Sequence, residues 1–218
     1  MPHCSTPTPA APSTTASAFW LVRHGESTWN TVGLAQGHND QAELTSRGQR
    51  QATEAAEGFR GRRVSAIYAS DLRRALQTAT AFSRVLRLPV STDARLRERS
   101  LGVLEGSPAA AIGPDLTGLG DGRVLDPDAR PYGGESVRDL YARAAGFYDD
   151  LTAGGRPAGD GDVLIVAHGG TVRVLEAYLH GIDVEQMRWQ PVGNATVVRI
   201  PQAPPSGAKS PATQSSDN

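Results

Sequence analysis

The chain has 218 residues, of which 39% are hydrophobic and 21% charged, and its formal net charge is −1. This length is enough for one well-buried domain, and the near-zero charge argues against a dedicated nucleic-acid binder, which would carry a basic excess. No apolar run approaches the roughly 20 residues that a membrane-spanning helix needs. The N-terminal segment lacks a basic start and an apolar stretch, so we expect no secretory signal and a cytoplasmic protein.

Two residue types are nearly absent, and this excludes several kinds of chemistry. Cys4 is the single cysteine, which excludes an intrachain disulfide and a multi-cysteine zinc site and argues against a cysteine nucleophile. Lys209 is the single lysine and lies in a segment rich in Pro and Ser, so the folded part offers neither a P-loop lysine nor a Schiff-base lysine. Any anion site must therefore be built from arginine, histidine, backbone N–H groups and helix ends.

The two ends of the chain differ from the middle in composition. Residues 1–17 and 201–218 are rich in Pro, Ser, Thr and Ala and have no periodic apolar pattern. We expect both to be disordered tails, because they cannot bury enough apolar surface to offset the entropy of ordering. The remaining residues, 18–200, are expected to form a single domain.

Short apolar runs alternate with helical patterns along this domain. The first half predicts strands at 18–22, 64–69 and 88–92 and helices at 44–59 and 71–86. The second half predicts a helix at 135–151, a strand at 162–167, a helix at 171–180 and a last strand at 195–200. Between these halves, residues 100–134 contain many Gly, Pro and Asp and are expected to form an irregular cover. Ser136 is expected to cap the helix that follows this cover.

This alternation predicts an α/β fold, a three-layer αβα sandwich with a mostly parallel central sheet. In such folds, ligands bind beyond the carboxyl ends of the strands. Three predicted strands end there in cationic or imidazole groups: the first at Arg23 and His24, the second shortly before Arg73 and Arg74, and a later one at His168.

If the strands are parallel, these groups lie together at the carboxyl edge of the sheet, which forms the mouth of the predicted site. Glycines beside both histidines allow a close approach of the backbone to a ligand, and the helix near Thr171 would direct its free N–H groups to the same place. The sequence therefore predicts an anion site, for which a dianionic phosphate is the natural ligand.

These histidines could also serve two other uses. A lone histidine at the end of a strand is most often a structural hydrogen-bonding residue, and a pair of histidines can hold a metal ion. The neighbouring arginines would repel a cation, so we expect no metal and no cofactor. Two histidines at equivalent strand ends, each beside arginine or glycine, favour the anion site over a structural role.

Five segments, in order along the chain, resemble the histidine phosphatase superfamily, also called phosphoglycerate mutase-like. They are LVRHGESTWN at 21–30, YASDLRRALQTA at 68–79, LRE at 96–98 with Gly102, Glu105 and Gly106 behind it, GGES at 133–136 and AHGGT at 167–171. Together they span almost all of residues 19–199. The resemblance implies a phosphoglycerate mutase-like fold and a histidine phosphatase-like catalytic domain over residues 18–200.

The resemblance also implies a role for particular residues. His24 would be the nucleophile that becomes phosphohistidine, and Glu98 would be the general acid and base. The clamp on the phosphoryl oxygens would be Arg23, Arg74 and His168; Arg74 is preferred to Arg73 because it fits the family pattern Ser-x-Leu-x-Arg-Ala. Auxiliary substrate contacts would come from Asn30, Gln36, Gly37 and Gly169. The other arginines are expected mostly at the surface; they are Arg60, Arg62, Arg63, Arg84, Arg87, Arg95, Arg97 and Arg99.

Three functions stay open at this point. The first is a phosphomonoester hydrolase that acts through phosphohistidine on a small phosphorylated metabolite. The second is a phosphoglycerate mutase, but mutases of this family carry an Arg- and Lys-rich insertion, whereas here the segment after Glu98 is short and has no lysine. The third, a catalytically silent module that binds phosphorylated ligands, is disfavoured because all five expected catalytic residues are present. The oligomeric state is open, and a homodimer is one of the alternatives.

Overall fold

The computed structural model describes residues 18–113, 117–153 and 161–201. The predicted tails lie outside the described residues except for Pro201, which is the last residue of a strand. Within the described part, no helix is long and apolar enough to cross a membrane.

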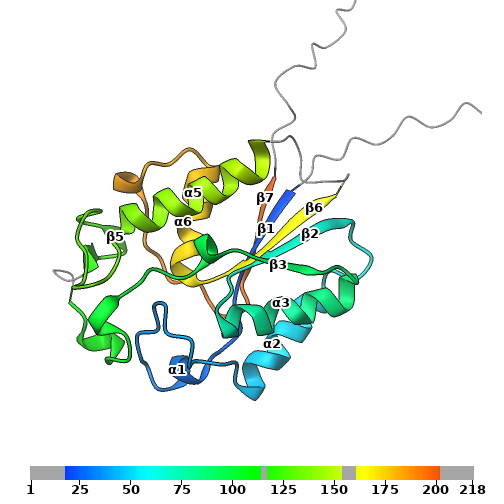
Figure 1. Cartoon of the computed structure of the whole chain (residues 1–218), viewed down its shortest axis with the longest axis horizontal. Coiled ribbons are helices and arrows are strands. Elements are labelled where there is room, and N and C mark those ends of the chain that lie inside the picture. The colour runs from blue at the N-terminus through cyan, green and yellow to red at the C-terminus, as the bar shows by residue number, and fades with distance from the viewer. Residues whose placement is uncertain (1–17, 114–116, 154–160, 202–218) are drawn as a thin grey trace, which may run out of the picture.

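The core of the fold is a five-stranded sheet with the strand order β3-β2-β6-β1-β7 (Figure 1). Its strands are β1 (Ala18–Arg23), β2 (Val64–Ala69), β3 (Val90–Thr92), β6 (Asp162–Ala167) and β7 (Val197–Pro201). The first four run parallel, and β7 pairs with β1 in the antiparallel direction at the edge. The predicted mostly parallel sheet is confirmed.

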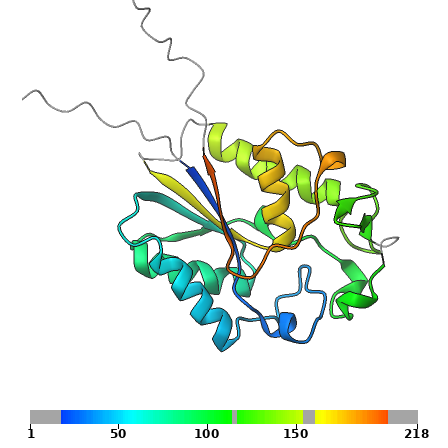
Figure 2. The ribbon, with the colours of Figure 1, turned by 180° about the vertical axis from the view of Figure 1, so that it is seen from behind.

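Helices cover both faces of this sheet, as the three-layer prediction requires. On one side lie α2 (Ser46–Glu57) and α3 (Arg73–Leu86), and on the other lie α5 (Val137–Ala153) and α6 (Gly169–Leu179). Seen from behind in Figure 2, the cyan α2 and the gold α6 lie on opposite sides of the blue β1. The helix α6 begins at Gly169, two residues before the predicted start at Thr171.

Side-chain alternation along the strands divides the buried residues into two cores. Phe19 and Leu21 of β1 pack in the core beneath α5 and α6, whereas Trp20 and Val22 pack in the core beneath α2 and α3. The neighbouring strand β6 follows the same rule, with Ile165 in the first core and its adjacent residues in the second. Because successive side chains of a strand point to opposite faces, a strand that is covered on both sides is apolar throughout.

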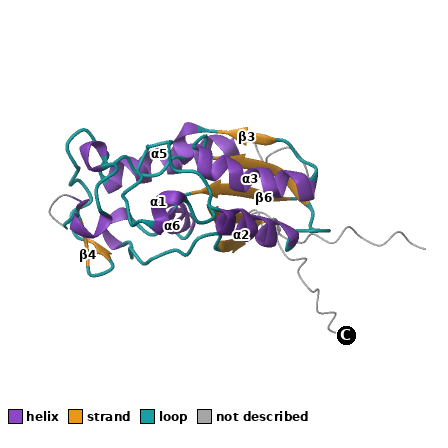
Figure 3. Cartoon of the chain, turned by 90° about the horizontal axis from the view of Figure 1, so that it is seen from below, coloured by secondary structure: helices purple, strands orange, loops and turns teal. Residues whose placement is uncertain are grey.

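The predicted irregular cover consists mainly of short turns. It contains 3-10 turns at Gly102–Leu104 and Ala109–Ala111, and two further 3-10 turns, Ala94–Leu96 and Val184–Gln186, lie outside this range. Its described residues also form a hairpin of β4 (Leu119–Gly120) and β5 (Arg123–Val124), joined by Asp121 and Gly122, both at positive φ. Figure 3 shows these loops and short elements gathered at one end of the molecule, with β4 and the short helix α1 (Thr28–Thr31).

Candidate functional site

The carboxyl ends of β1, β2 and β6 bring the two histidines together. The ladder continues one residue past the strands, because the His24 amide donates to the Ala167 carbonyl at 3.0 Å and the Ser70 amide donates to the Val166 carbonyl at 3.0 Å. Since β6 lies between β1 and β2, the residue after each strand faces the same mouth. The ring centroids of His24 and His168 are 5.2 Å apart, with an interplanar angle of 62°.

The hydrogen bond of His24 assigns its tautomer. Its Nδ1 lies 2.7 Å from the Gly25 carbonyl oxygen, which can only accept, so Nδ1 carries the proton. The other ring nitrogen, Nε2, therefore keeps a lone pair. Burial, followed by the charges of Arg74 and Arg23, holds the pKa of His24 well below 6.5. The His24 ring is thus a neutral imidazole with a free basic nitrogen at neutral pH.

His168 is also buried and neutral. Its Nε2 lies 2.9 Å from Ser70 Oγ, and burial, with the charge of Arg74 next in size, holds its pKa well below 6.5. When the Ser70 hydroxyl donates to Nε2, the proton of the neutral ring resides on Nδ1, which can then donate to a ligand.

Acid is expected to destabilise the protein through these two imidazoles. Below about pH 6.5 the unfolded chain takes up protons that the folded chain cannot, because burial lowers both pKa values, so the free energy of unfolding falls as the pH falls. Above that pH both rings are neutral in the folded and the unfolded chain, so they no longer make the free energy of unfolding depend on pH. Urea unfolding between about pH 7.5 and 5.5 should show this slope, and His168→Asn should reduce it. An identical slope in the parent and the variant would contradict a buried, depressed His168.

Two arginines flank the imidazoles from different elements. Arg74, fully buried at the start of α3, donates to the carbonyls of Gly37 and Asn39 at 2.8 Å, and burial lowers its pKa to about 10. Arg23, at the end of β1, donates from Nη1 to the Val192 carbonyl, and burial lowers its pKa while the charge of Glu98 opposes that shift. Both remain charged at neutral pH, so the mouth is cationic.

Unpaired polar atoms concentrate at this mouth. In the described part of the chain, the buried side-chain nitrogens without a hydrogen-bond partner are Arg23 Nε, His38 Nε2, Arg74 Nε and His168 Nδ1. Buried donors are nearly always satisfied, and an orphan left in a native structure needs an explanation. Three of these four nitrogens belong to the predicted phosphoryl clamp, and an oxyanion placed beside His24 would satisfy them.

Glu98 provides the carboxylate of the site. Its Oε1 accepts from the Arg99 amide and its Oε2 from the Gly170 amide, both at 2.9 Å. Its charge acts on both Arg23 and Arg74. The side chain fits because residue 170 is glycine: a Cβ there would lie 2.2 Å from Glu98 Oε1. The structure therefore brings together all five residues that the sequence analysis expected to be catalytic.

The expected auxiliary contacts are near this group but are already engaged within the protein. Asn30 is the third helical residue of a capping box in which Ser27 caps α1, and Gln36 Oε1 lies 3.0 Å from Ser27 Oγ. Gly37, at a φ of +48°, is the residue whose carbonyl receives Arg74. A Cβ on Gly169 would lie 3.6 Å from Arg23 Nε, which places this backbone beside the clamp. Their contacts with a substrate stay predictions.

Sequence reasoning missed three arginines around the site. Arg173 on α6 stacks 4.8 Å above the Trp189 ring, and its Nη1 would lie 3.5 Å from a Cβ on Gly169. Arg143 on α5 contacts the backbone beside Glu98. Arg99, expected at the surface, is only 3% exposed and donates to the carbonyls of three separate segments, so that expectation is wrong. Isolated arginines on amphipathic or irregular segments carry no sequence signal that separates them from surface charges.

No group of three or more His, Cys, Asp or Glu side chains in the described residues is arranged to hold a metal ion. The expectation of no metal and no cofactor stays a prediction.

The fold and the site define an α/β protein with an anion-binding centre built around a neutral histidine. The family model described as "Histidine phosphatase superfamily (branch 1)" matches residues 19–206, and the chain belongs to this superfamily. The family expected from the sequence is confirmed, and so is the phosphoglycerate mutase-like fold.

Relatives and solved structures agree with this assignment. A glucosyl-3-phosphoglycerate phosphatase of Mycolicibacterium vanbaalenii is 37% identical over 192 residues, which cover 83% of this chain and 82% of that protein. A probable phosphoglycerate mutase of Yersinia enterocolitica is 33% identical, with 83% of each chain covered. The structure of a mycobacterial glucosyl-3-phosphoglycerate phosphatase with VO3 matches with a TM-score of 0.72 and 35% identity, covering 84% of this chain and 90% of that one.

Proposed function

We propose that the protein is a phosphomonoesterase that transfers the phosphoryl group of a small metabolite to His24 and then to water. The observation that carries the proposal is the neutral His24 ring, whose Nε2 is free and whose neighbours Arg23, Arg74 and His168 each have an unpaired buried nitrogen. Phosphoryl transfer needs positioning and charge stabilisation more than covalent chemistry from the protein. The family and its named phosphatases support this enzyme class.

In the first step, His24 Nε2 attacks phosphorus and the bond from phosphorus to the ester oxygen breaks. Glu98 in its protonated form gives its proton to the departing oxygen, so an alcohol leaves and phosphohistidine remains. The guanidinium groups of Arg23 and Arg74 hold the phosphoryl oxygens, which arginine matches well with its planar fork of donors. His168 donates from Nδ1 to the same group.

In the second step, water attacks the phosphohistidine in line with the P–N bond. Glu98, now a carboxylate, accepts the proton of the water, the P–N bond breaks, and inorganic phosphate leaves. His24 recovers its lone pair and Glu98 its proton, so the enzyme returns to its starting state.

A phosphoglycerate mutase is the second candidate function, because relatives that carry this name match most of the chain. In a mutase the phosphohistidine must be kept from water until the product accepts the phosphoryl group. Here the described residues of the cover after Glu98 form short turns and a hairpin whose strands have two residues each. The sequence of the cover has no lysine. This composition favours access of water to the intermediate, and hydrolysis is the function we adopt.

The substrate class is a small phosphate ester, and its remaining groups are expected to include a second negative charge. Arg173 supports this, because its guanidinium lies beside Gly169 with one recorded hydrogen bond, from Nε to the Gln190 carbonyl. Cytoplasmic location and a homodimer stay predictions from the sequence.

A metabolite screen is expected to show release of inorganic phosphate, led by phosphoglycerate derivatives, and no requirement for a metal ion. Each ester would be assayed with and without EDTA, and 3-phosphoglycerate would also be assayed for conversion to 2-phosphoglycerate in the presence of the bisphosphate. Isomerisation faster than phosphate release would make the protein a mutase. Loss of activity in EDTA would contradict metal-independent chemistry.

A further inference from the structure

Glu98 lies on a segment that has no regular secondary structure to hold it. The segment leaves the 3-10 turn Ala94–Leu96 and runs on to Ser100 before the next turn begins. Its carboxylate must nevertheless be aimed at the imidazoles, since general acid catalysis requires hydrogen-bond reach of the departing oxygen. Some other part of the fold must therefore fix this backbone.

Arg143 on α5 fixes this backbone, and all five of its N–H groups are hydrogen-bonded. Its Nη1 donates to the carbonyls of Arg95 and Arg97 at 2.7 and 2.8 Å, and its Nη2 donates to the Glu98 carbonyl at 2.7 Å. The remaining two N–H groups form a two-pronged pair with the Glu135 carboxylate, both at 2.8 Å. An arginine has five N–H donors, so none is left for a substrate.

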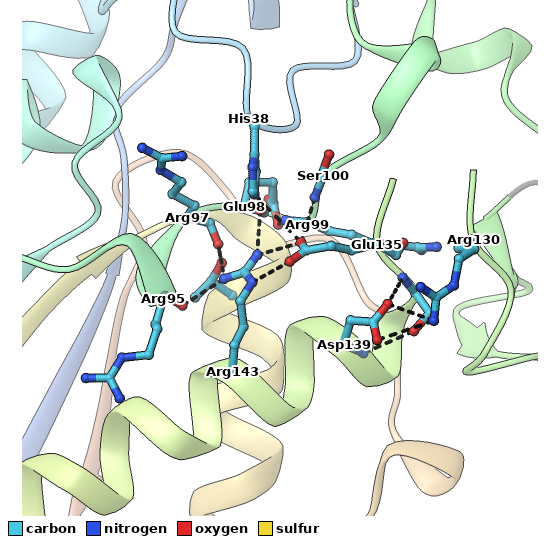
Figure 4. Close-up of polar contacts among 12 residues, drawn as sticks. His38, Arg95, Arg97, Glu98, Arg99, Ser100, Arg130, Glu135, Asp139 and Arg143 are labelled. Carbon is cyan, nitrogen blue, oxygen red and sulfur yellow. Dashed lines mark hydrogen bonds and ion pairs between the residues drawn. The ribbon is translucent and has the colours of Figure 1, made fainter. Parts of the chain in front are cut away.

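Glu135 adds a hydrogen bond on the C-terminal side of Glu98. Its Oε2 accepts from the Ser100 amide at 2.9 Å, so the Arg143–Glu135 pair holds carbonyls before Glu98 and an N–H group after it. Burial, the largest single influence, raises the pKa of Glu135, but the hydrogen bond and charge of Arg143, the Ser100 amide and the charge of His38 together lower it below its usual value. Figure 4 shows the pair beneath the segment, with Arg143 rising from the helix toward the carbonyls.

We propose that Arg143, paired with Glu135, is a positioning residue that sets the path of the backbone at Glu98 and so aims its carboxylate for proton transfer. The inference rests on the proposed function of Glu98 as acid and base. It assigns Arg143 no contact with substrate or with the reacting atoms.

Arg95 offers a matched control. It is also an arginine that ties this turn to α5, through hydrogen bonds to the Gly146 carbonyl and Asp150, and it pairs with Asp93 within the turn itself. It makes no recorded contact with Glu98 or Glu135. Replacing either arginine therefore removes hydrogen bonds between the turn and α5, whereas only replacing Arg143 removes the hydrogen bond to the Glu98 carbonyl.

The test compares kcat on an alkyl phosphate with kcat on p-nitrophenyl phosphate, whose leaving group departs without a proton. Arg143→Met is expected to lower kcat on the alkyl ester by about 10- to 100-fold and on the nitrophenyl ester by less than about 3-fold, a part of the usual general-acid contribution. Arg95→Met is expected to change neither rate by more than about 2-fold. Arg143→Lys, which keeps the charge but has only three donors, should fall between the parent and Arg143→Met.

A double variant separates positioning from general loss of structure. In the Glu98→Gln background, Arg143→Met should cost less than about 3-fold further, because the group that it positions is already disabled. Full additivity, or equal losses on both esters, would overturn the inference. If Arg143→Met does not fold, Arg143→Lys is assessed by the same two comparisons, between the two esters and between the parent and Glu98→Gln backgrounds. Should Glu98→Gln itself show no dependence on the leaving group, the acid role fails and the inference fails with it.

Discussion

Replacement of His24 by alanine is expected to lower kcat on every phosphate ester by on the order of 10⁴-fold or more, the scale on which enzymes lose activity with their nucleophile. The reason is structural: Nε2 of His24 is the nitrogen that combines a free lone pair with a position among the orphan donors of the clamp. The neighbouring His168 cannot replace it, because its Nε2 is engaged with Ser70. Steady-state assays on an alkyl and a nitrophenyl ester measure the loss.

Phosphate binding is the control for this variant. Arg23, Arg74 and His168 are untouched by the substitution, so inorganic phosphate should still bind to His24→Ala with an affinity within about tenfold of the parent. Retention of binding together with loss of turnover assigns His24 to chemistry. Turnover by His24→Ala within about tenfold of the parent would remove the nucleophile assignment.

Glu98→Gln is expected to produce a loss that depends on the leaving group. For an alkyl ester, kcat should fall by about 10²- to 10⁴-fold, the usual range for a lost general acid. For p-nitrophenyl phosphate the loss in the first step should be far smaller, because nitrophenolate leaves without a proton. The contrast between the two esters isolates proton transfer, and equal losses on both would exclude the acid role.

The amide in this variant has a structural consequence that needs its own measurement. Both Glu98 oxygens accept hydrogen bonds from backbone N–H groups, those of Arg99 and Gly170. Glutamine keeps only one acceptor oxygen, and its NH₂ group is a donor where the second oxygen was. One backbone N–H is then unsatisfied, at a cost of about 1–3 kcal/mol. Thermal unfolding of the variant should show that loss of stability, while the folded fraction at the assay temperature remains complete.

The placement of the two histidines was predictable because it follows from strand ends. The apolar runs of β1 and β6 are buried on both faces, whereas β2 is only partly buried. Runs buried on both faces can be recognised in a sequence as continuous apolar strands. The residue that follows a parallel strand must then lie at the common edge. Strand ends alone therefore place Arg23, His24, His168 and the Arg73-Arg74 pair at one edge, whereas the resemblance to the family was needed to choose Arg74 and to add Glu98.

The supports of the site were not predictable in the same way. Arg143 and Arg99 act through backbone carbonyls of irregular segments, and no spacing in the sequence states which carbonyl will lack a partner. Short elements were also missed: α1 has only four residues, too few for a helical period. The hairpin at β4 and β5 had a signal, since Asp121-Gly122 suits a tight turn with positive φ at both positions, but its strands of two residues each show no alternation.

Trapping of the covalent intermediate tests the central claim most directly. The parent enzyme would be mixed with a substrate that carries radioactive phosphate, quenched in alkali during turnover, digested and mapped. Label is expected on His24, stable in alkali and lost in acid, because a phosphorus–nitrogen bond has that stability. Label on any other residue, or a burst of alcohol product with no protein-bound phosphate, would contradict it.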